Sequence, residues 1–523
     1  MLRIFNHAIL HKYQSGWQMF PFHSFVVGIS PVLALFVENL WQVHFGEIVL
    51  PVLGVCLIIA VSLVAISHFT EDLTFSGVLV SIAVIWFFSY GHFYNLLIGF
   101  TFNNTVLGRE RWLIPVWGAV LPVALVILIK ARSRSGGISR AMNLVACVFV
   151  MLLGMKALNS ERVRSSKGKS VASTKTLAGN LKGNPQVKIN RSPSIYYIIL
   201  DSYSADSVLR EIYDYDNSEF YSYLERKGFY IAKASCSNYP VTALSLPSSL
   251  NMDYLDVVYG LKGRRDLGLD DVEWTVEGSA ITRYLSGKGY KIIREGSWWG
   301  KTASGPGAMG RMSFIFTEFN MELLRLTVLR PIAEQLFSPM LRKTVNNAID
   351  NMAALAKDPD QKFVFAHIIC PHPPFVFEAD GRPLGLFKSM SMRLTPKQLY
   401  INQVRFISKR VEGLVDTLLE NSKQPPIIII QADHGSGYVL HPTHNSAEPS
   451  DEFLQEQFRI LSAYYLPSGR NRDLSQGISP VNSMRVVLNS VFGEKFELLP
   501  NRSFYSNYKT PLNFTDVTER VAY

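Results

Sequence analysis

Acidic and histidine side chains follow three short apolar runs of the chain. The runs are residues 195–200, 363–367 and 427–431. The polar side chains at their ends are Asp201, His367, His372, Asp433 and His434. Where such runs are parallel strands, their carboxyl ends meet at one edge of a sheet, which is where open α/β sheets bind ligands. Carboxylate and imidazole groups together suit a divalent metal, so the sequence predicts a metal site at that edge.

Each of these clusters also has a plainer explanation when it is taken alone. Asp201 could cap the helix that follows it, because a short acidic side chain at a helix start accepts backbone N–H groups. A histidine in a proline-rich loop, as His372 is, is more often a structural residue than a ligand. Helix capping does not require three such clusters at separate strand ends, so together they favour the metal site.

A hydroxyl-rich segment, residues 238–249, supplies a group on which a metal could act. Its pattern is that of a turn entering a short helix, and it contains Thr242 and Ser245. The free N–H groups and the positive dipole end of such a helix attract an anionic ligand. A hydroxyl beside a divalent cation ionises more easily and can attack phosphorus or sulfur. The alternative is that Thr242 or Ser245 only caps the helix.

The elements that must position these residues begin near residue 194, where short apolar runs alternate with amphipathic stretches. Strands are predicted over residues 195–200, 228–232, 290–293, 363–367, 427–431 and 460–465. The first run is apolar on both faces, as in strands covered by helices on both sides. Helical spacing of apolar residues predicts a helix over 399–421. The sequence therefore predicts an α/β sandwich around a mostly parallel central sheet.

The first 157 residues differ in composition, because long apolar runs dominate them. Five runs reach, or nearly reach, the length needed to cross a hydrocarbon core of about 30 Å. They are residues 22–43, 46–68, 75–100, 112–129 and 141–157. The loop between the fourth and fifth runs is basic, which places it in the cytoplasm. Five spans then place every later residue outside the cytoplasm.

The organisation expected from these patterns has three parts. They are a five-helix transmembrane domain over residues 1–157, a basic flexible linker over 158–193 and an extracytoplasmic domain over 194–523. The formal net charge of +10 is concentrated in part in the linker, which either lies on anionic head groups or is a solvated tether. A nucleic-acid role is not expected outside the membrane. Cys236 and Cys370 either form one disulfide or are two buried thiols.

The order of the motifs carries a family resemblance. Asp201 is followed by Thr242-Ala-Leu-Ser-Leu-Pro, by His372-x-Pro and by Asp433-His434-Gly. This order resembles the sulfatase-like branch of the alkaline phosphatase superfamily. With membrane spans ahead of it, the chain is most similar to bacterial phosphoethanolamine transferases and lipoteichoic acid synthases. The family often has glutamate where this chain has Asp201, which retains the oxygen ligand on a side chain one methylene shorter.

The resemblance implies roles for individual residues. The implied metal ligands are Asp201, Thr242, Asp433 and His434. The implied catalytic residues are Thr242, as the nucleophile, and His372, on the substrate side. The candidate substrate-binding residues are His367, His441, His444 and Ser245. The mixed histidine and oxygen ligands favour one zinc or manganese ion, with magnesium and calcium as alternatives.

The implied reaction transfers a phosphoryl-linked head group, phosphoethanolamine or phosphoglycerol, from a membrane phospholipid to an envelope glycan or glycolipid. The intermediate would be a phosphothreonine at Thr242. The implied location is the bacterial cytoplasmic (inner) membrane, with the catalytic domain in the periplasm or outside the cell.

Two other functions remain open from the sequence. A membrane-anchored phosphodiesterase or sulfatase-type hydrolase would use the same residues with water as the acceptor. A mature sulfatase is disfavoured because Ser249 stands where the Cys/Ser-x-Pro-x-Arg signature has arginine. A catalytically degenerate envelope scaffold is the third function, and the retained Thr242 and Asp433-His434 pair argue against it.

Overall fold

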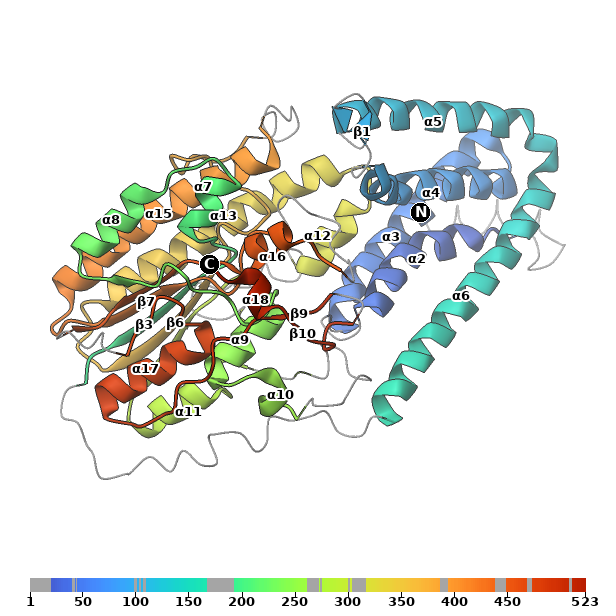
Figure 1. The fold of residues 1–523 in the computed structure, drawn as a ribbon. Helices are drawn as coiled ribbons and strands as arrows, with labels where there is room; N and C mark the ends of the chain where they lie inside the picture. Colours follow the sequence, from blue (N-terminus) through green and yellow to red (C-terminus); the bar gives the residue numbers. More distant parts are fainter. Residues whose placement is uncertain are drawn as a thin grey trace. The chain divides into compact units, whose positions relative to one another are not determined.

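A computed structural model gives the fold of the chain. It describes residues 20–39, 43, 45–97, 101–102, 105–106, 110–166, 192–260, 272, 275–299, 302, 317–385, 394–437, 448–467, 473–507 and 510–523. The chain divides into two compact units (Figure 1). One comprises Met1–Gly168 with Met312–Leu336, and the other comprises Lys169–Arg311 with Phe337–Tyr523.

The first unit is built around apolar helices. They are α2 (His23–Glu38), α3 (Phe45–Thr70), α4 (Leu73–Leu97), α5 (Glu110–Lys130) and α6 (Ser135–Ser166). Among the described residues, four stretches are helical, long and apolar enough to cross a membrane, namely Phe45–Thr70, Leu73–Leu97, Trp112–Lys130 and Arg132–Leu158. The first expected span, 22–43, is represented by α2, an apolar helix of 16 residues and about 24 Å.

Polar contacts show how α2 lies within this unit. At its start, the ring of His23 contacts Ser81 of α4 through Nδ1 at 2.6 Å and Ser139 of α6 through Nε2 at 3.0 Å. Near its other end, Glu38 forms an ion pair with Lys156, late in α6, at 3.4 Å. Helix α2 therefore runs alongside α6 from the beginning of that helix to a point near its end.

The first unit also contains a segment from much later in the sequence. It includes α12 (Glu318–Arg325) and the first turns of α13 (Arg330–Leu355). Phe319 and Leu323 of α12 share a buried apolar cluster with Val32 of α2, Ile48 of α3 and Phe88 of α4. A stretch within the range 194–523 therefore packs on the apolar helices.

The second unit contains a six-stranded sheet. Its strand order is β4 (Tyr230–Ile231), β8 (Ser462–Tyr465), β7 (Ile427–Gln431), β3 (Ile195–Leu200), β6 (Lys362–Ile368) and β5 (Lys291–Glu295). Strand β3 pairs in parallel with β6 and β7, and β5 pairs in parallel with β6. Strand β8 is antiparallel to both of its neighbours. All six strands expected from the sequence are present, and the sheet is mixed at β8.

Helices cover both faces of this sheet (Figure 1). Alternate residues of β3, Ile195, Tyr197 and Ile199, pack into one large cluster with α9 (Thr242–Asn251), α11 (Ala280–Gly287) and α17 (Pro480–Phe492). On the other face lie α8 (Ser218–Arg226) and α15 (Pro396–Asn421). Helix α15 begins with a capping box of Thr395 and Gln398 and ends at Asn421, as its apolar spacing predicted. The layers thus hold the strands of the α/β sandwich between apolar helix faces.

Short elements complete the described chain. They are β1 (Thr101–Phe102), β2 (Thr105–Val106), the 3₁₀ helix Arg132–Arg134, α7 (Asp206–Glu211), α10 (Leu255–Val258), α16 (Asp451–Phe458), β9 (Phe504–Tyr505), β10 (Thr515–Asp516) and α18 (Thr518–Val521). Cys236 and Cys370 are both free thiols. Of the two alternatives expected from the sequence, the structure therefore shows two unpaired cysteines and no disulfide between them.

Candidate active site

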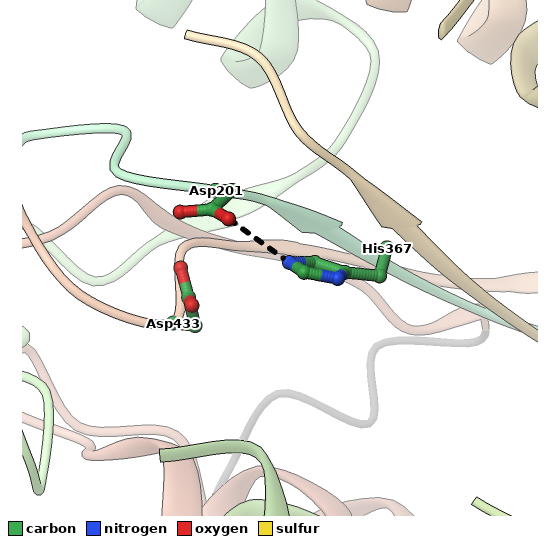
Figure 2. A group of neighbouring side chains, drawn as sticks. All are labelled: Asp201, His367 and Asp433. Atoms are coloured by element: carbon green, nitrogen blue, oxygen red, sulfur yellow. Dashed lines mark ion pairs between the residues drawn. The ribbon is translucent and has the colours of Figure 1, made fainter. Parts of the chain in front are cut away.

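Strand register brings three of the singled-out residues together. Ile199 of β3 pairs with His367 of β6 on one side and with Gln431 of β7 on the other. Asp201 and Asp433 each lie two residues beyond this paired level, so both carboxylates project from the same sheet edge as the His367 ring. The ligand atoms of the three residues are buried and lie within 4.8 Å of one another (Figure 2). Of these three, only the two carboxylates belonged to the metal set expected from the sequence.

His367 is held with one ring nitrogen toward the carboxylates. Its Nε2 lies 3.2 Å from Oδ2 of Asp201. Its Nδ1 lies 2.8 Å from the hydroxyl of Thr302, which in turn contacts the Ser297 hydroxyl at 2.6 Å. A hydrogen bond on the far side of the ring is what fixes the orientation of a ligating histidine. No sequence pattern pointed to Thr302, which lies in a loop between β5 and α12.

One carboxylate oxygen in the cluster is left for a cation. Oδ1 of Asp433 accepts the N–H of Ser202 at 3.3 Å, whereas its Oδ2 is buried and has no hydrogen bond to any described residue. Ser202 also contacts Asp201 through its hydroxyl at 3.2 Å and adopts a left-handed backbone with φ of 63°. A buried carboxylate oxygen that accepts no hydrogen bond is costly. Its place beside a second carboxylate and an imidazole fits a divalent metal.

The charge of Asp201 follows from its neighbours. Burial alone would raise the pKa of this carboxyl. The nearby His372, the hydrogen bond from His367 and the proximity of His434 lower it by more than burial raises it. The resulting pKa lies well below the usual aspartate range, so Asp201 is an anion at neutral pH. An anionic, desolvated carboxylate is a strong ligand for a cation.

His434 connects the acidic cluster to Thr242. Its Nε2 lies 3.2 Å from the Thr242 hydroxyl, 3.6 Å from Oδ1 of Asp201 and 3.5 Å from Oδ2 of Asp433. Its Nδ1 lies 2.9 Å from the carbonyl oxygen of Gly435 and can donate to it, which leaves Nε2 facing the carboxylates. Burial lowers the pKa of His434, but Asp433, Asp201 and the Gly435 carbonyl outweigh burial and raise it above its usual value.

Thr242 is the first residue of α9 and is half-buried. The N-cap position of this helix belongs to Val241, and no side chain caps it, so the Thr242 hydroxyl does not serve as a cap. It contacts His434 instead. Ser245 differs, because it is buried and its hydroxyl donates to the carbonyl oxygen of Tyr239 at 2.8 Å. Ser245 thus ties α9 to the turn that precedes it.

A close backbone approach supports the turn after β7. The N–H of Gly435 donates to the carbonyl oxygen of Gln457 at 2.7 Å. A Cβ atom at Gly435 would overlap the carbonyl oxygen of Glu456, so this position requires glycine. The side-chain amide of Gln457 donates to the carbonyl oxygen of Pro240, two residues before Thr242. Residues 456–457, which no sequence motif singled out, therefore join the Asp-His-Gly turn to the turn before α9.

The remaining histidines have different places. The backbone N–H of His372 donates to the carbonyl oxygen of Asp201 at 3.1 Å. Its ring is half-buried and meets the ring of His434 edge-on, with centroids 6.3 Å apart. His372 thus lies beside Asp201 and His434. His441 and His444 lie outside the described residues.

Comparison with known proteins gives matches among solved structures. No family model and no curated protein matches the sequence. The C-terminal periplasmic domain of EptC from Escherichia coli is 12% identical, with a TM-score of 0.42, over 63% of this chain and 94% of that chain. The corresponding domain of the phosphoethanolamine transferase EptC from Campylobacter jejuni is 14% identical, with a TM-score of 0.33, over 59% and 92%. A phosphonate monoester hydrolase from Silicibacter pomeroyi is 12% identical, with a TM-score of 0.38, over 60% and 79%.

At these identities and TM-scores the likeness assigns neither a substrate nor a reaction to this chain. One of these neighbours is a phosphoethanolamine transferase domain and another is a phosphonate monoester hydrolase. The order of motifs resembles the sulfatase-like branch of the alkaline phosphatase superfamily, and apolar helices of spanning length lie ahead of the α/β domain.

Proposed function

We propose that this chain is a membrane-anchored, metal-dependent phosphotransferase. It would move phosphoethanolamine or phosphoglycerol from a membrane phospholipid to a hydroxyl of an envelope glycan or glycolipid, through a phosphothreonine at Thr242. The observation that carries this proposal is the place of the Thr242 hydroxyl. It lies at a helix start, 3.2 Å from Nε2 of His434, beside a buried cluster of Asp201, His367 and Asp433.

The proposed metal ligands are Asp201, His367, Asp433 and His434. The buried Oδ2 of Asp433, which accepts no hydrogen bond from any described residue and faces Nε2 of His434 at 3.5 Å, supports a cation at this position. A set of two carboxylates and two imidazoles suits zinc or manganese better than calcium. When bound, the ion would supply Lewis-acid stabilisation of negative charge and a lowered pKa for a nearby hydroxyl. Thr242, expected from the sequence to be a ligand as well as the nucleophile, remains a proposed member of this set.

The reaction would consist of two successive displacements at phosphorus, both carried out by residues of this chain. In the first, the Thr242 oxygen attacks phosphorus, the bond to the diacylglycerol oxygen breaks, and diacylglycerol leaves as an alcohol with one proton. In the second, an acceptor hydroxyl attacks the phosphothreonine, and Thr242 regains its proton. Backbone N–H groups at the start of α9 and the side chain of His372 would stabilise charge on the non-bridging oxygens.

The proposed topology has five spans. Helix α2 lies alongside α6 over most of its length, which supports counting it as a span despite its 16 residues. The loop joining α5 and α6 contains Lys130, Arg132, Arg134 and Arg140 and is proposed to be cytoplasmic. The α/β domain would then lie in the periplasm, or outside the cell, within reach of phospholipid head groups. Membrane phospholipid is thus the proposed donor, and no nucleic-acid partner is proposed.

An intact-mass experiment tests the reaction. The full-length protein is incubated with vesicles of phosphatidylethanolamine and phosphatidylglycerol, with added zinc or manganese. The mass of the protein, and then the masses of its proteolytic peptides, are measured by mass spectrometry. We expect a head-group phosphate on the peptide that contains Thr242, and none in Thr242→Ala or after chelation. Thr417→Ala on α15, whose hydroxyl donates to the carbonyl oxygen of Gly413 in the same helix, is the matched control and should keep the adduct.

The same experiment separates the alternatives. An adduct that is released only when a glycan acceptor is added indicates a transferase. Release to water at the same rate without any acceptor indicates the hydrolase, which the same residues would also support. Absence of both bound metal and adduct in the folded protein would contradict the proposal and favour a scaffold.

A further inference from the structure

Residues 317–336 belong to the apolar unit although they come from the middle of the α/β domain's sequence. Helix α12 buries Phe319 and Leu323 against the apolar helices. Beyond α12, Val328 packs on a second cluster that contains Tyr90 of α4 and Trp117 of α5. The segment therefore contacts the apolar helices at more than one point.

Backbone hydrogen bonds tie the segment to α4. The N–H of Gly91 donates to the carbonyl oxygen of Leu326 at 2.9 Å, and the N–H of Val328 donates to the carbonyl oxygen of Phe87 at 3.0 Å. Phe87 and Gly91 are four residues apart, the spacing that an uninterrupted α-helix joins by its own hydrogen bond. A Cβ atom at Gly91 would come within 2.5 Å of the Leu326 Cα, so glycine permits this approach. Irregular backbone at such a place is stable where protein buries it.

All these contacts lie at one end of the apolar helices. They involve the later part of α4, through Phe87 and Gly91, and the early part of α5, through Trp117. The basic loop Lys130–Arg140 lies at the other end of α5. The guanidinium of Arg330 stacks on the ring of Tyr94, close to the end of α4, at 3.9 Å. The segment therefore docks at the end opposite the basic loop, which is the outer end in the proposed topology.

The segment carries an exposed apolar ridge beside these contacts. Leu329, Ile332 and Leu336 are 38%, 46% and 55% exposed. Ile332 and Leu336 are four residues apart on one face of α13, and Leu329 directly precedes this helix. Pro331 and Ala333, between them, are buried. At the same end of the unit, α4 exposes Leu96, two residues after the Tyr94 ring that Arg330 covers.

We propose that Leu329, Ile332 and Leu336 enter the outer leaflet of the bilayer as an interfacial anchor. Amphipathic helices of this kind bury their apolar face roughly 5–10 Å into the boundary between head groups and acyl chains. The occupant of the exposed ridge is thus lipid, because the ridge lies at the outer end of apolar helices whose exposed side chains face lipid in the proposed topology. Arg330, held on Tyr94 next to the ridge, lies where a cation would meet anionic head groups. The α/β domain would then be joined to the membrane through residue 336 as well as through the linker 158–193. This proposal goes beyond the phosphotransfer reaction and does not depend on it.

Collision accessibility of spin labels tests the anchor. Single cysteines are introduced as Leu329→Cys, Ile332→Cys or Leu336→Cys in the full chain with its four native cysteines replaced by serine. Each variant is labelled with a nitroxide in nanodiscs of phosphatidylethanolamine and phosphatidylglycerol. Oxygen, which partitions into lipid, and a water-soluble nickel chelate are the two relaxing agents. Val123→Cys on α5, at a site 60% exposed, is the lipid-facing control, and Val257→Cys, at a site 56% exposed in the other unit, is the water-facing control.

We expect oxygen to increase the relaxation rate of the nitroxides on the ridge more than the nickel chelate does, as it should at position 123. A ratio like that at position 257 would show that the ridge faces water and would overturn the proposal. Low accessibility to both agents would show that protein covers the ridge and would overturn it equally. Because the three side chains are exposed parts of the same ridge, a well-folded variant at any one of them is sufficient for the test.

Discussion

The Nε2 atom of His434 lies 3.2 Å from the hydroxyl oxygen of Thr242, although the two residues are 192 positions apart. This contact joins a side chain at the start of α9 to the acidic cluster at the end of β7. Neither residue is held there by its own segment alone, because Gln457 and Gly435 bring the two turns together. The contact is the geometric basis for assigning Thr242 as a nucleophile.

The first prediction concerns this hydroxyl. Thr242→Ala should lower head-group release from a phospholipid on the order of 10³-fold or more, as expected when a nucleophile is removed. Thr242→Ser keeps a hydroxyl and should retain measurable activity. Release of a labelled head group from vesicles measures both. Equal activity in Thr242→Ala and the wild type would rule out the assigned role.

A second prediction concerns the orientation of His367. Thr302→Val removes the hydroxyl that contacts Nδ1 of His367 at 2.8 Å and should weaken metal binding about 10–100-fold. Thr302→Ser retains the hydroxyl and should bind nearly as the wild type does. Titration of the metal-free protein with zinc or manganese, followed calorimetrically, gives the affinities. If His367 served only the fold, the valine variant would change thermal stability without changing metal affinity.

A third prediction concerns the turn after β7. Gly435→Ala should destabilise the α/β domain by about 1–3 kcal/mol or more, because the added methyl group would overlap the backbone of Glu456. Gly413→Ala, within α15, adds a methyl group where nothing lies within 4 Å and should be neutral or stabilising by up to about 1 kcal/mol. Thermal unfolding of the two variants compares them. A Gly435→Ala protein as stable as Gly413→Ala would contradict the close approach.

The fourth prediction concerns Gly91. Gly91→Ala should lower the melting temperature of the full-length protein in detergent, because its methyl group would collide with residues 325–326. Gly118→Ala on α5, where nothing lies within 4 Å, is the matched control and should leave the melting temperature nearly unchanged. Protease cleavage near residue 326 should rise only in Gly91→Ala. The same melting temperature and cleavage in both variants would show that the segment does not pack on α4 there.

A pH dependence is expected from Glu456. Burial raises the pKa of this carboxyl from 4.5 to about 7, against hydrogen bonds from Tyr213 and Ser436 that lower it. The folded chain therefore retains a proton that the unfolded chain loses near pH 4.5. Below pH 4.5 the Glu456 carboxyl costs the folded protein no stability. The free-energy cost grows as the pH rises from 4.5 to 7, and above pH 7 it reaches on the order of 3 kcal/mol.

Glu456→Gln should remove this dependence. Its melting temperature should fall less than that of the wild type between pH 5 and pH 8, as measured by intrinsic fluorescence. Glu420→Gln, at an exposed position on α15, should keep the wild-type profile. Identical pH profiles for Glu456→Gln and the wild type would exclude the raised pKa.

Local patterns in the sequence were sufficient for the secondary-structure elements and for singling out most of the side chains that meet at the candidate site. The apolar runs before Asp201 and Asp433 indicated buried strands, and the proline and polar residues after 421 indicated where α15 ends. Five apolar spans were expected from composition, and four of them are present as helices of spanning length, whereas the first is the 16-residue helix α2. These features depend on residues close together in the chain, so periodicity and composition reveal them.

Tertiary structure decided what depends on distant pairing. The register of β3 against β6 pairs His367 with Ile199, and this pairing brings the His367 ring beside Asp201. The antiparallel pairing of β8 likewise could not be predicted, because a short apolar run carries no signal of its direction. The packing of residues 317–336 on the apolar helices depends on a glycine 235 positions before Leu326. Contacts of this kind arise from shape and backbone hydrogen bonds across the fold, which no local pattern of the sequence encodes.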